Sequence, residues 1–258
     1  MDADHPSSVR EGPPDSQPVD GVGINPFSIG RAAALAFARE GAQVALIART
    51  EERLRPVADE VEKIGGNALI VPADVADRDQ VYGMVETVIE VFGQIDILLN
   101  NAGIGLLVSV EDMNPADLKR VVDVNLYGLI WCTQAVLPHM EAQGGGAIVN
   151  ISSISGISHI GVPSTSYSAA KAALNQLTQN IAVEYAVKNI RANCVLPGLM
   201  NTPFILREKN GVPNHIRKGY RTVEEYHAAR SAKIPMRRMG DAWDVARAAL
   251  FLASDDAA

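Results

Sequence analysis

Residues 31–48 read RAAALAFAREGAQVALIA, and this stretch indicates the fold class. Its first ten residues are rich in alanine with apolar residues at helical spacing, and Gly41 stands where a helix commonly ends. Gln43–Ala48 is then a short, nearly continuous apolar run, which is typical of a strand buried on both faces. A helix followed closely by such a strand is one step of a parallel α/β sheet.

The same alternation continues along the chain. Further helices are expected at about 51–64, 77–92, 115–140, 165–187 and 241–253, and further strands at about 68–72, 95–100, 147–151 and 190–196. Strands separated by helices of ten or more residues form parallel units covered on both faces. We therefore predict an α/β fold with a doubly wound parallel sheet in a single domain. Ligands of such sheets bind beyond the carboxyl ends of the strands.

Composition excludes several classes of protein. The chain has 258 residues, a net charge of -7 and 47% hydrophobic residues, so neither disorder nor a nucleic-acid or anionic-membrane partner is favoured. Cys132 and Cys194 lie among apolar residues and are interpreted as reduced core cysteines. The five histidines show no metal-ligand spacing, and no apolar run reaches the roughly 18 residues of a membrane span. We expect a cytoplasmic protein with no metal site and no signal peptide.

The residues with the clearest chemistry follow the expected strands. Tyr167 and Lys171 stand four apart in YSAAK, on one face of an expected helix. The strand AIVNISS before them ends on Ser152 and Ser153, and Asn125 lies inside the long helix in VVDVNLYG. Another strand closes with LLNNAG at residues 98–103. The Tyr-Lys spacing alone is weak evidence, but the four motifs in this order are specific.

Together these motifs resemble the short-chain dehydrogenase/reductase family, a single-domain Rossmann group, from Ile29 to Ala258. The resemblance implies that Tyr167 is the general acid/base, that Lys171 activates it, and that Ser153 holds the reacting oxygen. It also implies that Asn125 anchors a water linking Lys171 to solvent, although a helical Asn can simply bond a neighbouring backbone. Ser152 is the competing hydroxyl and is expected to face the core or cap the strand end.

These roles require a change in the acidity of the phenol. A free phenol titrates near 10, so a base working near pH 7 needs stabilisation of its anion by about 4 kcal/mol. A neighbouring ammonium and an oxidised nicotinamide both favour the phenolate, and we therefore expect the pKa of Tyr167 to be lowered.

The family's glycine-rich turn corresponds here to GVGINPFSIG, residues 21–30. Gly30 at a helix start leaves free amides for a pyrophosphate. Ser28 replaces the middle glycine, and Gly23 fits the first glycine only if the loop is one residue longer than usual. The resemblance assigns the other cofactor contacts, besides Tyr167 and Lys171, to Ile29, Asp74, Val75, Asn101, Ala102, Gly103, Pro197, Gly198, Met200 and Thr202. For Thr202 the alternative is an N-cap of a following helix.

The cofactor preference depends on residues after the strand Gln43–Ala48. Ala48 occupies the position where an acidic residue would bind the adenosine ribose, and Arg49 follows it. A guanidinium can grip a 2′-phosphate, so the sequence favours NADP(H) over NAD(H). The alternative is that Arg49 is a solvated surface charge.

Both ends depart from the family. Such a domain begins with an apolar strand in the middle of its sheet, whereas SSVREGPPDSQPVD has three prolines and four charges. The C-terminus stops at FLASDDAA, before the family's last strand. We therefore predict a disordered segment at 1–20 and a domain at 21–258 that lacks its first and last strands, and we hypothesise a misplaced start or a shifted reading frame together with a truncated end. A lid is expected at about 201–235.

The resemblance implies hydride transfer between a nicotinamide and a carbonyl or secondary alcohol of a small molecule. The expected pocket is nearly all apolar and favours a hydrophobic or ring ketone; its residues are Ile104, Leu106, Leu107, Ile157, Val162, Leu199, Phe204 and Ile205. The alternatives are a 3-oxoacyl thioester reductase and an inactive remnant that only binds a dinucleotide. The family's pairing of helices implies a homodimer or homotetramer.

Overall fold

Helices in this protein begin at residues that can accept hydrogen bonds from free backbone amides. In the computed structural model, which describes residues 28–206 and 219–257, Ser28 accepts from Arg31 N at the start of the first helix. Asp77 accepts from two amides of the third helix, and Asp241 forms a reciprocal capping box with Asp244 at the last one. The caps fix helix starts close to where the sequence predicts them.

The helices are α1 Ile29–Arg39, α2 Arg55–Lys63, α3 Arg78–Phe92, α4 Pro115–Val122, α5 Gly128–Gln143, α6 Thr165–Tyr185, α8 Val223–Ser231 and α9 Ala242–Ala253. The strands are β1 Gln43–Ala48, β2 Asn67–Pro72, β3 Ile97–Asn100, β4 Gly146–Ile151, β5 Ile190–Val195, β6 Met200–Asn201 and β7 Gly240–Asp241. Every strand pairing among the described residues is parallel. The predicted α/β class is confirmed.

The described strands of the main sheet form two groups, called here its two halves. β1 pairs with β2, and β3, β4 and β5 form a second group in that order. Among the described residues, no strand joins β1 to β3, and none pairs with the outer edge of β5. The segment before α1, where the family's first strand would stand, lies outside the described residues.

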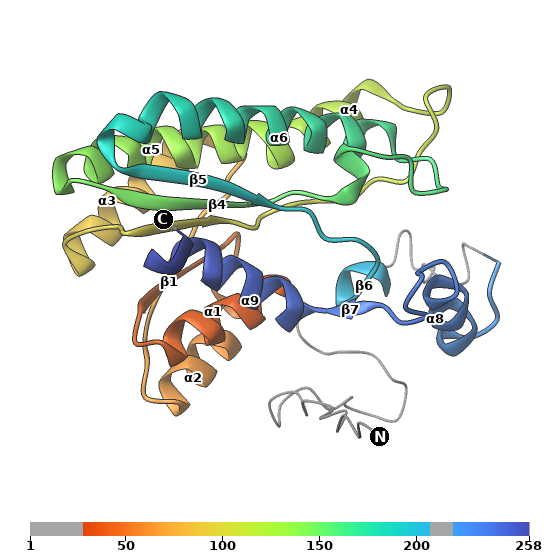
Figure 1. Ribbon diagram of the computed structural model, residues 1–258, viewed down its shortest axis with the longest axis horizontal. Helices are drawn as coiled ribbons and strands as arrows, with labels where there is room; N and C mark the ends of the chain where they lie inside the picture. The colour runs from red at the N-terminus through yellow and green to blue at the C-terminus, as the bar shows by residue number, and fades with distance from the viewer. Residues whose placement is uncertain (1–27, 207–218, 258) are drawn as a thin grey trace, which may run out of the picture.

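Helices on both faces hold the two halves together. On one face α3 and α5 pack over apolar residues of both halves, and on the other α1 and α9 do the same. Figure 1 shows this layering, with α5 and α6 above β4 and β5 and with α1, α2 and α9 below. On each face the apolar core therefore extends over both groups of strands.

Two parts of the chain differ from the sequence prediction. The expected single helix at 115–140 contains a π-helical turn at Asp123–Tyr127, between α4 and α5. The expected irregular lid at 201–235 contains β6, a 3-10 turn at Pro203–Leu206 and the helix α8. Two-residue strands such as β6 and β7 leave no periodic pattern in a sequence. Residues 207–218 of the lid and the N-terminal segment 1–20 lie outside the described residues.

One helical stretch, Pro115–Gln143, is long and apolar enough to cross a membrane by length and composition alone. Half of its most apolar window is buried inside the protein. Its segments contact α3, α6, β3 and β4. These contacts are those of a core helix.

Candidate active site

A row of polar side chains crosses the three-stranded half of the sheet near its carboxyl end. Asn100, Asn150 and Cys194 are register partners on β3, β4 and β5. Asn100 Nδ2 donates to Asn150 Oδ1 at 2.9 Å, and Asn150 Nδ2 donates to Thr178 Oγ1 at 2.8 Å. The Thr178 hydroxyl lies 3.2 Å from Cys194 Sγ. Buried polar groups that satisfy one another hold strands in a single register.

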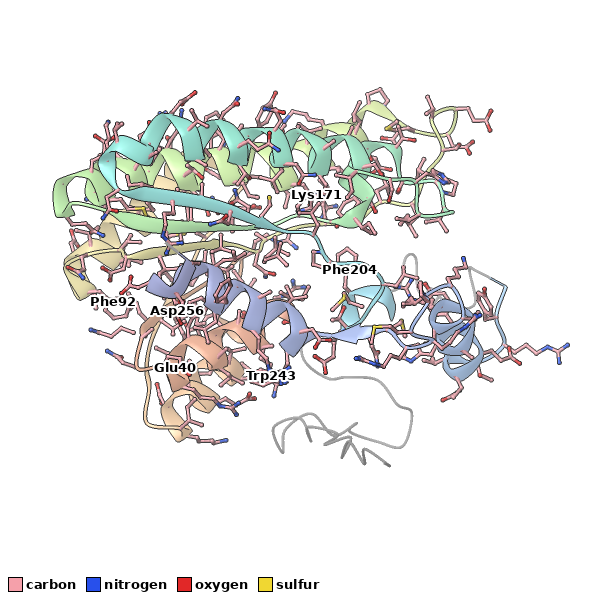
Figure 2. The ribbon with its side chains drawn as sticks, in the orientation of Figure 1. Glu40, Phe92, Lys171, Phe204, Trp243 and Asp256 are labelled. Carbon is pink, nitrogen blue, oxygen red and sulfur yellow. The ribbon has the colours of Figure 1, made fainter. Side chains whose placement is uncertain are left out.

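Lys171 reaches from α6 to this end of the sheet (Figure 2). Its side chain is 3% exposed, and its Nζ donates to Ile151 O at 2.7 Å. Burial lowers the pKa of Lys171 to about 8, with a weaker opposing effect from Cys194. Ser152 Oγ donates to Lys171 O at 3.2 Å, so Ser152 faces α6 and the core, as expected.

Tyr167 lies one helical turn before Lys171, whose Nζ is 5.8 Å from the centroid of the phenol ring. Burial raises the pKa of Tyr167, and hydrogen bonding with the Ser153 side chain opposes the rise. This direction is opposite to the expected one, because loss of solvent around the phenol outweighs the effect of its neighbours in the chain. Ser153 Oγ also accepts from Ser155 N at 3.1 Å. The structure thus brings Ser153, Tyr167 and Lys171 together.

Asn125 is fully buried in the π-helical turn, where its side chain forms hydrogen bonds with the loop after β3. Its Nδ2 donates to Ile104 O at 2.9 Å, and its Oδ1 accepts from Ile104 N at 3.2 Å. A Cβ built on Gly103 would lie 2.9 Å from Asn125 Oδ1 and 3.9 Å from Lys171 Nζ. Asn125 therefore positions the backbone of the loop after β3 beside the buried amine. This role is close to the alternative given for the sequence, in which a helical Asn simply bonds a neighbouring backbone. π-Helical turns occur frequently at functional sites.

The start of α1 forms a cradle that would hold a dinucleotide pyrophosphate. A Cβ built on Gly30 would lie 2.7 Å from Asn101 Nδ2, so a larger residue at this position would displace the Asn101 side chain in the loop after β3. The first amides of α1, around Ser28, Ile29 and Gly30, have no helical partner and provide donors for an anion. These residues fit the cofactor that the sequence predicts. Gly23 lies outside the described residues.

Other predicted cofactor residues lie at the same end of the strands. Asp74 accepts from Ala76 N in a turn before α3, and Val75 packs against Gly128, where a Cβ would lie 2.9 Å from Val75 O. Arg49 is exposed directly after β1, and Ala102 is exposed directly after Asn101 in the loop that follows β3.

The chain after β5 is tied to the strand ends from two sides. Pro197 O accepts from Ile154 N at 3.0 Å, next to Ser153. Met200 pairs with Gly240 through β6 and β7, which fixes this segment to the start of α9. Thr202 is buried and Gly198 is exposed. All these segments meet at the carboxyl end of the sheet.

The sequence reasoning missed the row from Asn100 to Cys194. The signal was available, because Asn100 and Asn150 both end apolar strands just before the recognised motifs.

His159 is in an exposed loop, where its Nδ1 accepts from Gly161 N at 3.1 Å. That bond is local to its own turn. Among the described residues no group of three metal-ligating side chains occurs.

Comparisons with known proteins agree with this geometry. Residues 23–258 match a family model described as Enoyl-(Acyl carrier protein) reductase. The 7α-hydroxysteroid dehydrogenase of Clostridium sardiniense is 40% identical over 88% of this chain and 83% of that protein. The 3-oxoacyl-[acyl-carrier-protein] reductase FabG of Thermotoga maritima is 38% identical over 88% of this chain and 87% of that protein.

A solved structure shows the same architecture. It is a 7α-hydroxysteroid dehydrogenase complexed with NADH and 7-oxo glycochenodeoxycholic acid, with a TM-score of 0.76 and 31% identity over 90% of this chain and 85% of that one. From its fold, its family match and these relatives, the chain belongs to the short-chain dehydrogenase/reductase family of oxidoreductases, which bind a nicotinamide dinucleotide.

Proposed function

We propose that this protein transfers a hydride between NADP(H) and the carbonyl or secondary alcohol of a small hydrophobic molecule. The observation that carries the proposal is the buried amine of Lys171 beneath the ring of Tyr167, with Ser153 bonded to the same phenol. An amine, a phenol and a hydroxyl gathered at one strand end are the groups that carbonyl reduction needs. NADP(H) would supply the hydride itself.

Each side chain has a distinct task in this proposal. Ser153 would hold the reacting oxygen, and Tyr167 would exchange a proton with it. Because burial raises the pKa of Tyr167, the phenol is protonated at neutral pH. A protonated phenol is the form that donates a proton to a carbonyl oxygen, which is the role that carbonyl reduction requires of Tyr167. Asn125 holds the loop after β3 beside Lys171, whose amine donates to Ile151 O.

NADP(H) is proposed over NAD(H) because of the two residues at the end of β1, Ala48 and Arg49. Ala48 offers no carboxylate to a ribose 2′-hydroxyl, and the exposed guanidinium of Arg49 is adjacent to it. A 2′-phosphate would pair with that guanidinium. The solved relative was complexed with NADH, so the preference is a property to be measured for this chain.

The walls around the site support a neutral, apolar substrate. The loops at 101–110, 152–166 and 196–206 contain no Asp, Glu, Lys or Arg. Relatives named for hydroxysteroids, and the solved complex with a 7-oxo bile acid, act on or bind ring ketones and ring alcohols. A second candidate is reduction of a 3-oxoacyl thioester, which the similarity to FabG favours.

We also propose that the protein is cytoplasmic and assembles as a homodimer or homotetramer. Ala169, Ala172 and Ala173 are exposed on α6, and small side chains permit close approach of a second helix. Light scattering of the purified protein would test the assembly directly.

The first experiment is a thermal melt of the chain alone and titrated with NADPH and NADH in parallel. A cooperative transition that rises much more with NADPH supports the nucleotide site and its preference. Turnover of ring ketones, linear ketones and an acetoacetyl thioester then separates the two candidate substrates. A melt that responds to a nucleotide without turnover of any of them would favour a non-catalytic dinucleotide-binding protein.

A further inference from the structure

Gly156 packs on one peptide unit of α6, the unit between Lys171 and Ala172. A Cβ built on Gly156 would lie 2.8 Å from the carbonyl carbon of Lys171 and 3.0 Å from Ala172 N. Both atoms belong to the helix backbone, so they cannot turn aside as the end of a side chain can. Gly156 ends the 3-10 turn Ile154–Gly156, and its φ is not positive. The contact with α6, and not the backbone conformation, therefore accounts for a glycine at this position.

The end of β4 is bonded to the same part of α6 in two further places. Ser152 Oγ donates to the carbonyl oxygen of Lys171 at 3.2 Å, and this carbonyl belongs to the peptide unit that Gly156 contacts. The amine of Lys171 donates to Ile151 O at 2.7 Å. The chain between Ile151 and Gly156 therefore contacts Lys171 at its side chain, at its carbonyl oxygen and at the peptide that follows it.

Ser153 lies between these contacts in the sequence. Ser152 joins the residue before it to α6, and Gly156 joins the residue three positions after it to the same peptide unit. Tyr167 stands one helical turn before that unit and is hydrogen-bonded to the Ser153 side chain. The separation of the serine hydroxyl from the phenol is therefore set from both sides of Ser153.

We propose that Gly156, with the hydroxyl of Ser152, is a positioning residue that holds Ser153 and Tyr167 at the separation needed to bind one substrate oxygen together. The inference rests on the proposed function and assigns Gly156 a role through Ser153. A side chain at position 156 would push the turn and the helix apart, because close-packed backbone leaves no space for it. Reaction geometry tolerates little displacement, since a misplacement of about 1 Å can lower a rate about a hundredfold.

The test begins with kinetics of the wild type and of Gly156→Ala with NADPH. The wild type is assayed on 2-decalone, 2-decanone and acetoacetyl-CoA, and the substrate with the highest kcat/KM is used for the variants. Ordinary contacts begin at 3.4 Å, so the added methyl group must move the turn or the helix by about half an ångström. We expect kcat to fall about tenfold while the dissociation constant of NADPH stays close to wild type.

The control is Gly83→Ala, because a Cβ on Gly83 meets nothing within 4 Å, and it should leave kcat unchanged. A Cβ on Gly156 would also lie 2.9 Å from Asn175 Nδ2, which is a side-chain atom. Adding Asn175→Ala to Gly156→Ala removes that atom and leaves the two backbone atoms, so it should not restore kcat. Recovery of kcat in this double variant would overturn the role of the backbone contact.

A second pair of variants tests whether Gly156 acts through Ser153. Gly156→Ala should lower kcat about tenfold in the wild type and should have little further effect when Ser153 is already alanine. General loosening of α6 would instead lower kcat by the same factor in both backgrounds. Melts and NADPH titrations of every variant check folding and cofactor binding independently of turnover.

Ser152→Ala keeps the proposal testable where Gly156→Ala does not fold, because it removes a hydroxyl and adds no atom. We expect it to lower kcat about threefold, again with little effect when Ser153 is alanine. A folded wild type that binds NADPH and turns over none of the three substrates overturns the proposed function together with this inference. An active wild type whose kcat is unchanged in folded Gly156→Ala, or in Ser152→Ala where the former does not fold, overturns only the positioning role.

Discussion

Replacing Lys171 by methionine should stabilise the protein at neutral pH while removing its activity. The side chain is 3% exposed, and burial lowers its pKa from the ordinary 10.5 to about 8. The difference corresponds to about 3 kcal/mol in favour of the neutral amine in the folded state. At pH 7 the amine is nevertheless charged, so the folded state carries that cost. Methionine fills a similar volume without charge.

The sign of the pH dependence follows from proton binding. Between pH 8 and pH 10.5 the unfolded chain keeps a proton on Lys171 that the folded chain has lost, so the wild-type free energy of unfolding rises across this window through this group. Below pH 8 the amine is charged in both states, and the full cost remains. The methionine variant loses the bond to Ile151 O, which costs about 1 kcal/mol. Its net advantage at pH 7 is therefore about 1–2 kcal/mol, and it should vanish or reverse by pH 10.

Urea denaturation at pH 7, 8, 9 and 10 measures this difference. Subtracting the wild-type free energy of unfolding from that of the variant at each pH cancels the titration of every group that the substitution leaves unchanged. Lys63→Met is the control, because Lys63 is exposed and its substitution should give a difference independent of pH across pH 7–9. Parallel stability curves for wild type and Lys171→Met from pH 7 to pH 10 would refute the argument that burial depresses this amine.

Three further predictions concern separate parts of the structure. Tyr167→Phe should abolish ketone reduction while NADPH titration and melting temperature stay close to wild type; retained turnover would exclude Tyr167 as the proton donor. Gly30→Ala should weaken NADPH binding by about tenfold, because its Cβ would lie 2.7 Å from Asn101 Nδ2, displace that side chain and place a methyl group beside the free amides at the start of α1; titration against Gly83→Ala, where a Cβ meets nothing within 4 Å, measures this, and equal affinities would contradict it. Arg191→Met should lower the free energy of unfolding in urea by about 2 kcal/mol, because the guanidinium donates to carbonyls at the end of α9 at 2.7–3.1 Å; an unchanged midpoint would show that those bonds contribute nothing.

The fold was predictable where the pattern is periodic and the burial complete. Gln43–Ala48 was assigned as a strand from its apolar run, and β1 has those bounds. The helices expected at about 77–92 and 241–253 begin within a residue of those positions, where Asp77 and Asp241 cap α3 and α9. The interruption at Asp123–Tyr127 was not predictable, because a π-helical turn keeps the apolar pattern of its helix and changes only the hydrogen-bond spacing.

The site was predictable in its positions more than in its electrostatics. Ser153, Tyr167 and Lys171 converge because they stand at fixed points of β4 and α6. Burial of the ring raises the pKa of Tyr167 in the chain itself, and this effect depends on the three-dimensional surroundings of the ring, which a motif does not contain. The contact of Gly156 with the peptide after Lys171 also joins two segments, and no pattern within either segment indicates it.

The division of the sheet assigns different parts of the proposed function to its two halves. Asn125, Ser153, Tyr167 and Lys171 all belong to the β3–β4–β5 half and its helices, where the polar row from Asn100 fixes the register. The end of β1 belongs to the other half, and the helices on both faces connect the two. A dinucleotide that spans from the end of β1 to Tyr167 must therefore bridge both halves, so its binding energy stabilises their relative position. It follows that NADPH should raise the melting temperature by fixing the two halves relative to each other. The catalytic residues should change little, because their own half already holds them in place.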